Sequence, residues 1–153
     1  MDKSGSKAWT ETCGIEFEYK GEKLADYVND ESTLRGKVGI IKWNTKMEGN
    51  AIGEAHVGNV RGPAKGFVLS IYAGYFGKNN KDLINTMTHE MGHVIGLPHS
   101  ANINSIMYPT EDSKATLQKS DKAMCQYFRY RWSGLNDSEA EEKSGVVFNG
   151  GFN

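Results

Sequence analysis

The stretch HEMGHVIGLPHS, residues 89–100, organises the rest of this chain. It places histidines at positions 89, 93 and 99 and a glutamate at position 90. Because an α-helix turns by about 100° per residue, His89 and His93 lie on one face of a helix through this segment. The apolar residues of the same segment fall on the opposite face: Leu83, Ile84, Met87, Met91, Val94 and Ile95. We therefore expect one face of the helix to pack and the other to bind.

The three histidines have the number and chemistry of a catalytic zinc site. Imidazole is the commonest protein ligand of zinc, and a catalytic zinc takes three protein ligands and keeps one position open. Gly96 follows the last periodic residue, where a helix often ends at positive φ, so the chain can turn and bring His99 back. Glu90 lies too far round the helix to be the third ligand, but it can reach a water held by the metal. The alternative is that these are ordinary surface or capped histidines.

The motif and the residues after it resemble a known family. The pattern HExxHxxGxxH, followed by Ser-Ile-Met-Tyr-Pro at 105–109, is similar to the metzincin metalloproteases, and Ser100 and the Met-Tyr-Pro run resemble their matrixin branch. The zinc ligands implied by the resemblance are His89, His93 and His99. It also implies a general base at Glu90 and a Met-turn at Met107 beneath the metal. Tyr108 and Pro109 are then expected in the wall of the pocket for the residue after the cut bond.

The same resemblance implies a fold class, α+β with a zincin-like metzincin catalytic domain. Such a domain has a twisted, mostly parallel sheet with an antiparallel edge strand, an active-site helix and a C-terminal helix. We expect it to span residues 9–132, followed by a polar tail or linker at 133–153. The N-terminal part is shorter than the family pattern, because the first strand is missing. A fragment or a reduced fold is the favoured explanation, and the alternative is that 145–148 or a partner chain fills the gap.

Periodicity predicts the elements around the motif. Strands are expected at 15–20, 38–43, 51–57 and 66–73. The resemblance makes 51–57 the edge strand, to which an extended substrate can add itself through main-chain hydrogen bonds. A last helix is expected at 116–130. Asp121 in this helix resembles the acidic residue that in matrixins ties the helix to the cleft-side segment, and the alternative is an ordinary solvated carboxylate. The first eight residues are polar and small, which predicts a frayed end.

Composition excludes several classes of protein. The 18 basic and 19 acidic residues give a net charge of −1 without a long run of like charge, so nothing indicates a nucleic-acid partner. No window is apolar enough for a membrane span, and the N-terminus lacks the apolar core of a signal peptide. We expect a secreted monomer whose signal peptide is absent from this sequence. Cys13 and Cys125 are the only cysteines and form either a disulfide or two free thiols.

The predicted function is that of a zinc-dependent endopeptidase that cleaves extended peptide or protein substrates, with Glu90 as the base. One catalytic zinc ion is expected, and calcium is an additional candidate. The family's structural zinc site needs several ligands, but only His56 aligns with it, so we expect no structural zinc and place His56 on the sheet surface. The alternatives are a zinc-containing peptide-binding module, an inactive protease relative, or a hydrolase of another amide.

Overall fold

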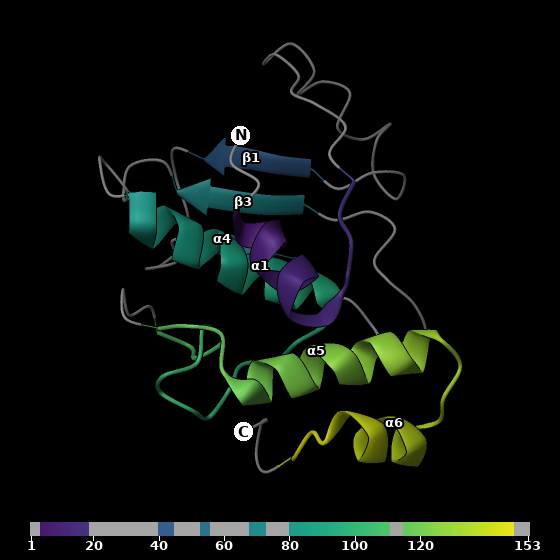
Figure 1. Ribbon diagram of the computed structural model, residues 1–153. Helices are drawn as coiled ribbons and strands as arrows, with labels where there is room; N and C mark the ends of the chain where they lie inside the picture. The colour runs from purple at the N-terminus through teal and green to yellow at the C-terminus, as the bar shows by residue number, and fades with distance from the viewer. Residues whose placement is uncertain are drawn as a thin grey trace.

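The structure is a computed structural model of the 153-residue chain, and it describes residues 4–18, 40–44, 53–55, 68–72, 80–110 and 115–148. Figure 1 shows a small group of strands on one side of the helix that carries the histidines and two further helices on the other side. No helix among these residues has the length and apolar character that crossing a membrane requires.

Three short strands pair in the order β1-β3-β2. Strand β1 (Ile40–Asn44) runs parallel to β3 (Val68–Tyr72), with Ile40 opposite Val68. Strand β2 (Gly53–Ala55) runs antiparallel to β3, with Gly53 opposite Ile71. Strands are expected at 38–43, 51–57 and 66–73, and a shorter strand is found at each position, with β1 ending one residue later than expected. As expected, β2 occupies one edge of the described sheet.

Helix α4 (Asn80–Ile95) carries the first two histidines, and helix α1 (Ser4–Cys13) packs across it. The two helices come close at Gly5, where an added Cβ would lie 2.9 Å from the Cβ of Met87. The indole Nε1–H of Trp9, which is fully buried, donates a 2.7 Å hydrogen bond to the carbonyl of Thr88. Trp9 thereby ties α1 to α4 one residue before His89.

Helices α5 (Lys119–Trp132) and α6 (Asp137–Ser144) form a hairpin on the opposite side of α4 from β1 and β3 (Figure 1). Helix α6 begins with reciprocal hydrogen bonds between Asn136 and Glu139, and it ends at Gly145 with φ of 73°. Ala140 is fully buried against α5, and the Tyr127 hydroxyl donates to Asp137 across the hairpin.

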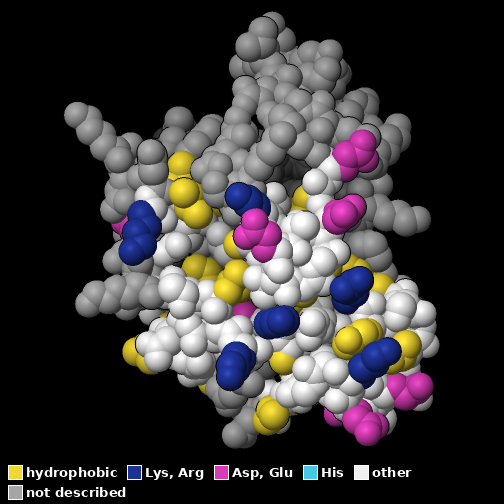
Figure 2. Space-filling view, in the orientation of Figure 1, with side chains coloured by type: hydrophobic (Ala, Val, Ile, Leu, Met, Phe, Trp, Pro, Cys, Tyr) yellow, Lys and Arg dark blue, Asp and Glu magenta, His cyan; other side chains and the backbone are white. Residues whose placement is uncertain are grey.

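The main core lies between α1, α4, α5, strand β3 and the segment after the histidines. Its largest fully buried apolar side chains are Trp9, Leu69, Ile95, Leu97 and Met107. Over the described part of the face shown in Figure 2, basic and acidic side chains are interspersed, in keeping with the near-zero net charge.

The expected fold class is wrong for the described part of the chain. Its helices are 10, 16, 14 and 8 residues long, whereas its strands have only 5, 3 and 5 residues, so helices rather than a twisted sheet dominate. The strand expected at 15–20 is one reason, since 14–18 has no regular structure. There the Ile15 carbonyl accepts a 2.6 Å hydrogen bond from the Thr10 hydroxyl, which ties this segment back to α1.

Two polar segments are helical against expectation. Residues 4–8, expected to fray, belong to α1, and residues 137–144, expected in a polar tail, form α6. Tertiary contacts explain both helices, because α1 packs against the longer α4 and α6 packs against the longer α5. Residues 145–148 lie beside α5, where the Phe148 ring meets that of Tyr127, and they do not extend the described sheet. The domain boundary at 132 stays a prediction.

Candidate metal centre

The structure brings the three predicted histidines together. The Nε2 atom of His93 lies 3.1 Å from that of His89 and 3.2 Å from that of His99. One ligand atom from each of the three residues lies within 4.8 Å of the others, and this is the one such group of histidine, cysteine or acidic residues found in the described ranges. His89 and His93 come from successive turns of α4. His99 follows the turn at Gly96, whose φ of 129° confirms the expected positive-φ end of the helix.

Backbone carbonyls orient two of the rings. The Nδ1 of His89 lies 2.7 Å from the Ile106 carbonyl oxygen, and the Nδ1 of His93 lies 2.7 Å from that of Leu97. A carbonyl oxygen can only accept, so each Nδ1 must carry the proton and each Nε2 of the neutral ring must present a lone pair. These lone pairs point toward the same small volume. The hydrogen bond at the far ring nitrogen is the usual way in which a protein orients a metal-binding histidine.

This arrangement fits a metal ion. The Nε2 atoms of His89 and His93 lie 3.1 Å apart and cannot hydrogen-bond each other, because both rings carry their proton on Nδ1. Their lone pairs therefore repel each other, and a cation bound between them would remove this repulsion. Burial lowers the pKa of His89 to about 4, despite the opposing hydrogen bond to Ile106. Burial also lowers the pKa of His93. Both rings are therefore neutral near pH 7, as metal ligation requires.

Glu90 lies on the same helix, directly after the first histidine, and is only 7% exposed. Its Cγ and Oε1 face the backbone of Gly53 in the edge strand β2, so the carboxylate stands between the metal centre's helix and the sheet edge. Three nitrogen ligands and a neighbouring carboxylate are the parts from which water-activating zinc sites are built.

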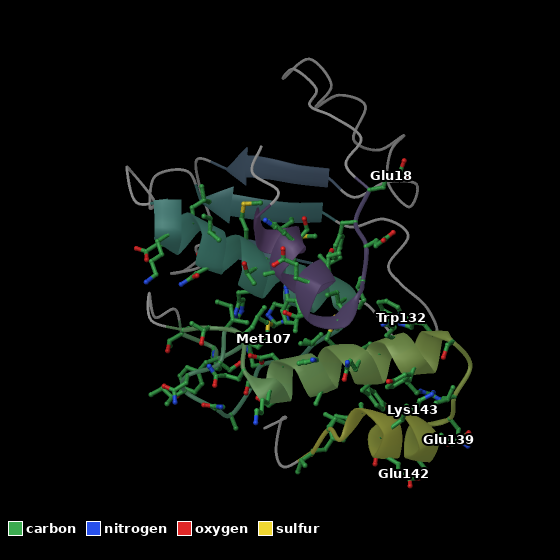
Figure 3. All side chains as sticks on the ribbon, viewed as in Figure 1. Glu18, Met107, Trp132, Glu139, Glu142 and Lys143 are labelled. Carbon is green, nitrogen blue, oxygen red and sulfur yellow. A yellow bond between two sulfur atoms is a disulfide. The ribbon has the colours of Figure 1, made fainter. Side chains whose placement is uncertain are left out.

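The turn around Met107 is joined to the segment of His99 by a backbone hydrogen bond and packs against helix α4. Met107 is fully buried, and Figure 3 shows it between α4 and α5. The Sδ of Met107 and the ring of Trp9 both pack against Gly92, and they leave no space for a side chain at that position of α4. The Ser100 N–H donates 2.9 Å to the Met107 carbonyl, which joins the segment of the third histidine to this turn. Met107 therefore packs against α4 at Gly92, one residue before His93, and its role as a Met-turn stays a prediction.

Asp121 ties α5 to this turn, and the alternative of a solvated carboxylate is wrong. Its side chain is fully buried and accepts 2.5 Å from the Ser105 hydroxyl and 2.7 Å from the Gln118 N–H. The same Ser105 oxygen accepts 2.9 Å from the Met107 N–H. Burial raises the pKa of Asp121, although these hydrogen bonds oppose the shift. The hydroxyl of Ser105 thus joins the Asp121 carboxylate to the peptide group between Ile106 and Met107. The carbonyl of that same peptide group accepts the hydrogen bond from His89.

The remaining predicted residues have mixed outcomes. Tyr108 is half-buried and Pro109 is exposed, and their role in a pocket wall stays a prediction. His56 lies outside the described residues. Cys13 and Cys125 form a disulfide with a Cα–Cα distance of 6.2 Å, which joins α1 to α5. It is reinforced by the Arg129 guanidinium, which donates 3.1 Å to the Cys13 carbonyl.

Sequence reasoning missed the supporting residues. Ser105 lies in the motif quoted above but showed no sign of its bridging role, and Trp9 showed no sign that it would join α1 to α4. Gly53 and Thr86 showed no signal in the sequence, because their importance depends on which segments meet in space.

Comparison with known proteins agrees with this geometry. The matrixin family model matches residues 6–129, which is most of the 153-residue chain. A search of curated proteins gave no match. The matched range contains most of α1, the described strands, the three clustered histidines, the Met107 turn and most of α5. The chain is a member of the matrixin family.

Proposed function

We propose that this protein is a zinc-dependent endopeptidase. The observation that carries the proposal is the convergence of three histidine Nε2 atoms beside a largely buried glutamate. Membership of the matrixin family implies a protease in general terms, and the geometry suggests which residues would perform the reaction. His89, His93 and His99 are the proposed zinc ligands.

The proposed mechanism gives Glu90 the role of proton carrier. A zinc ion, when bound by the three histidines, supplies Lewis acidity toward a water molecule and toward the scissile carbonyl. Glu90 would accept the proton of the attacking water and deliver it to the leaving amine. Its position next to the first ligand and its burial keep the carboxylate near the reacting atoms and away from bulk water. No covalent intermediate is required.

The proposed substrate is an extended peptide or protein segment. Strand β2 lies at the edge of the described sheet and contacts α4 beside Glu90. A peptide that adds to such an edge binds through its main chain, so side-chain specificity would be secondary. The disulfide is typical of oxidising compartments, which supports the proposal that the protein is secreted.

A quenched fluorogenic peptide library tests this function. Wild type loaded with zinc should cleave, and a chelator should abolish cleavage. Glu90→Ala should keep one zinc ion per chain yet lose turnover by several orders of magnitude, because the proton carrier is gone. If wild type binds zinc and peptides without cleaving any of them, the protein is a binding module or an inactive relative. Full activity of Glu90→Ala would remove Glu90 from the mechanism.

A further inference from the structure

Strand β2 touches the helix of the metal centre at one glycine. A Cβ added to Gly53 would lie 2.9 Å from both Cγ and Oε1 of Glu90 and 3.0 Å from Cγ2 of Thr86. Carbon atoms in folded proteins do not pack at such distances without a shift of one partner, since the optimum is about 3.5–4.0 Å. A side chain at position 53 would therefore require Glu90 or Thr86 to shift.

The requirement at this position is for space and not for an unusual backbone. Gly53 is not among the glycines with positive φ, and it pairs regularly with Ile71 in the sheet. Gly53 is the first residue of β2, and a glycine in a strand often marks a site where another group approaches the backbone closely. Here the approaching group is the side chain of Glu90.

Thr86 forms the other wall of this gap. Thr86 and Glu90 lie four residues apart on α4 and therefore project to the same side of the helix. Thr86 is 1% exposed, and its methyl group faces Gly53 while its hydroxyl oxygen has no hydrogen-bond partner among the described residues. Packing against the methyl group is thus the main interaction that Thr86 makes with the strand.

We propose that Gly53 is a positioning residue for Glu90. The missing side chain lets Cγ and Oε1 of the glutamate rest against the strand backbone, which sets the carboxylate at one place beside the histidines. This inference rests on the proposed function, because it concerns the residue assigned there as proton carrier. It also fixes the spacing between that carboxylate and the strand edge where a substrate would bind.

The test is Gly53→Ala, measured beside wild type. We expect unchanged zinc content and a KM within about threefold of wild type, but a kcat lower by about 100-fold, because catalysis is sensitive to misplacements of about 1 Å. A general loss of folding would lower the unfolding midpoint instead and would not separate kcat from KM. Crystal structures of both proteins should show the Glu90 carboxylate displaced by roughly 1 Å.

Two variants of the opposite wall supply rescue and control. Thr86→Ser removes only the methyl group that crowds position 53, so Gly53→Ala/Thr86→Ser should regain about tenfold in kcat over Gly53→Ala. Thr86→Val keeps a methyl group there and loses no hydrogen bond, so it should not rescue. If Gly53→Ala does not fold, the double variant Gly53→Ala/Thr86→Ser is compared with Thr86→Ser alone. The double variant is then expected to have a kcat at least about tenfold lower than that of Thr86→Ser.

A folded, zinc-loaded Gly53→Ala enzyme with wild-type kcat, or equal rescue by Thr86→Ser and Thr86→Val, would overturn the inference. Failure of the proposed function gives a different result, since wild type itself would then cleave nothing. In that case the crystallographic position of Glu90 decides, and an unmoved carboxylate in Gly53→Ala refutes the positioning role.

Discussion

Ser105→Ala should weaken both the fold and the metal centre, because one hydroxyl serves two buried partners. Removing it leaves the Met107 N–H without its acceptor and Asp121 Oδ1 without its donor. Each buried polar group that loses its partner costs about 1–3 kcal/mol, so the loss of both partners should lower the unfolding free energy by about 2–6 kcal/mol. For a domain of this size, about 2–4 °C per kcal/mol, that corresponds to a fall in Tm of about 4–24 °C.

The same substitution should reach the metal through His89. Its Nδ1 is held by the Ile106 carbonyl, which lies between Ser105 and Met107 in the turn that the hydroxyl stabilises. Loss of such supporting groups typically lowers metal affinity by about 10–100-fold. Urea unfolding of the apo protein measures the stability, and competition with a chromophoric chelator measures the zinc affinity.

Ser133→Ala is the matched control for this prediction. Its hydroxyl also donates one hydrogen bond, at 2.7 Å to the Tyr130 carbonyl, but the residue is exposed at the end of α5. This control should change stability by less than about 0.5 kcal/mol and leave zinc affinity unchanged. If Ser105→Ala behaves like Ser133→Ala in both assays, the proposed support of the metal centre by this hydroxyl is wrong.

Three further perturbations have expected outcomes. Replacing Cys13 and Cys125 by alanine opens a cross-link between residues 112 apart and should cost about 2–5 kcal/mol in urea unfolding, and an unchanged midpoint would contradict this. For the apo protein, the lowered pKa of His89 makes the unfolding free energy highest above pH 6.5 and lower toward pH 4, because the unfolded chain takes up the proton at higher pH than the folded chain. The loss should reach at most about 3 kcal/mol. An unfolding free energy that does not change with pH in calorimetry would refute the shift. Ala140→Glu places a charge in a fully buried site of α6 and should lower the unfolding free energy by several kcal/mol. The control Ser138→Glu lies on the exposed side of α6 and should change the unfolding free energy by less than about 0.5 kcal/mol. Equal effects of the two substitutions would mean that α6 does not pack against α5 as described.

Local geometry explains why the metal centre was predictable from sequence. Residues four apart on a helix share a face, and a glycine after the last turn allows the chain to reverse, so the spacing of the histidines and Gly96 nearly defines the cluster. Short apolar segments likewise indicated β1 and β3. The same local rules failed at 15–18, where alternation predicted a strand but a hydrogen bond from Thr10 holds the segment to α1.

The missed helices depend on contacts that a sequence does not display. Helix α1 has few apolar residues, and its Trp9 bond, the disulfide and the Arg129 contact all involve partners far along the chain. Helix α6 did carry a local signature, since Asn136 and Glu139 form a capping box and Gly145 ends the helix. Its polar composition obscured that signal.

Zinc content after equilibrium dialysis at neutral pH tests the central claim most directly. The geometry of the three histidines predicts one tightly bound zinc ion per wild-type chain and its loss in His93→Ala, the variant that removes the ring lying close to both others. A folded wild-type protein that retains no zinc, or a His93→Ala variant that retains it as tightly as wild type, would contradict the assignment.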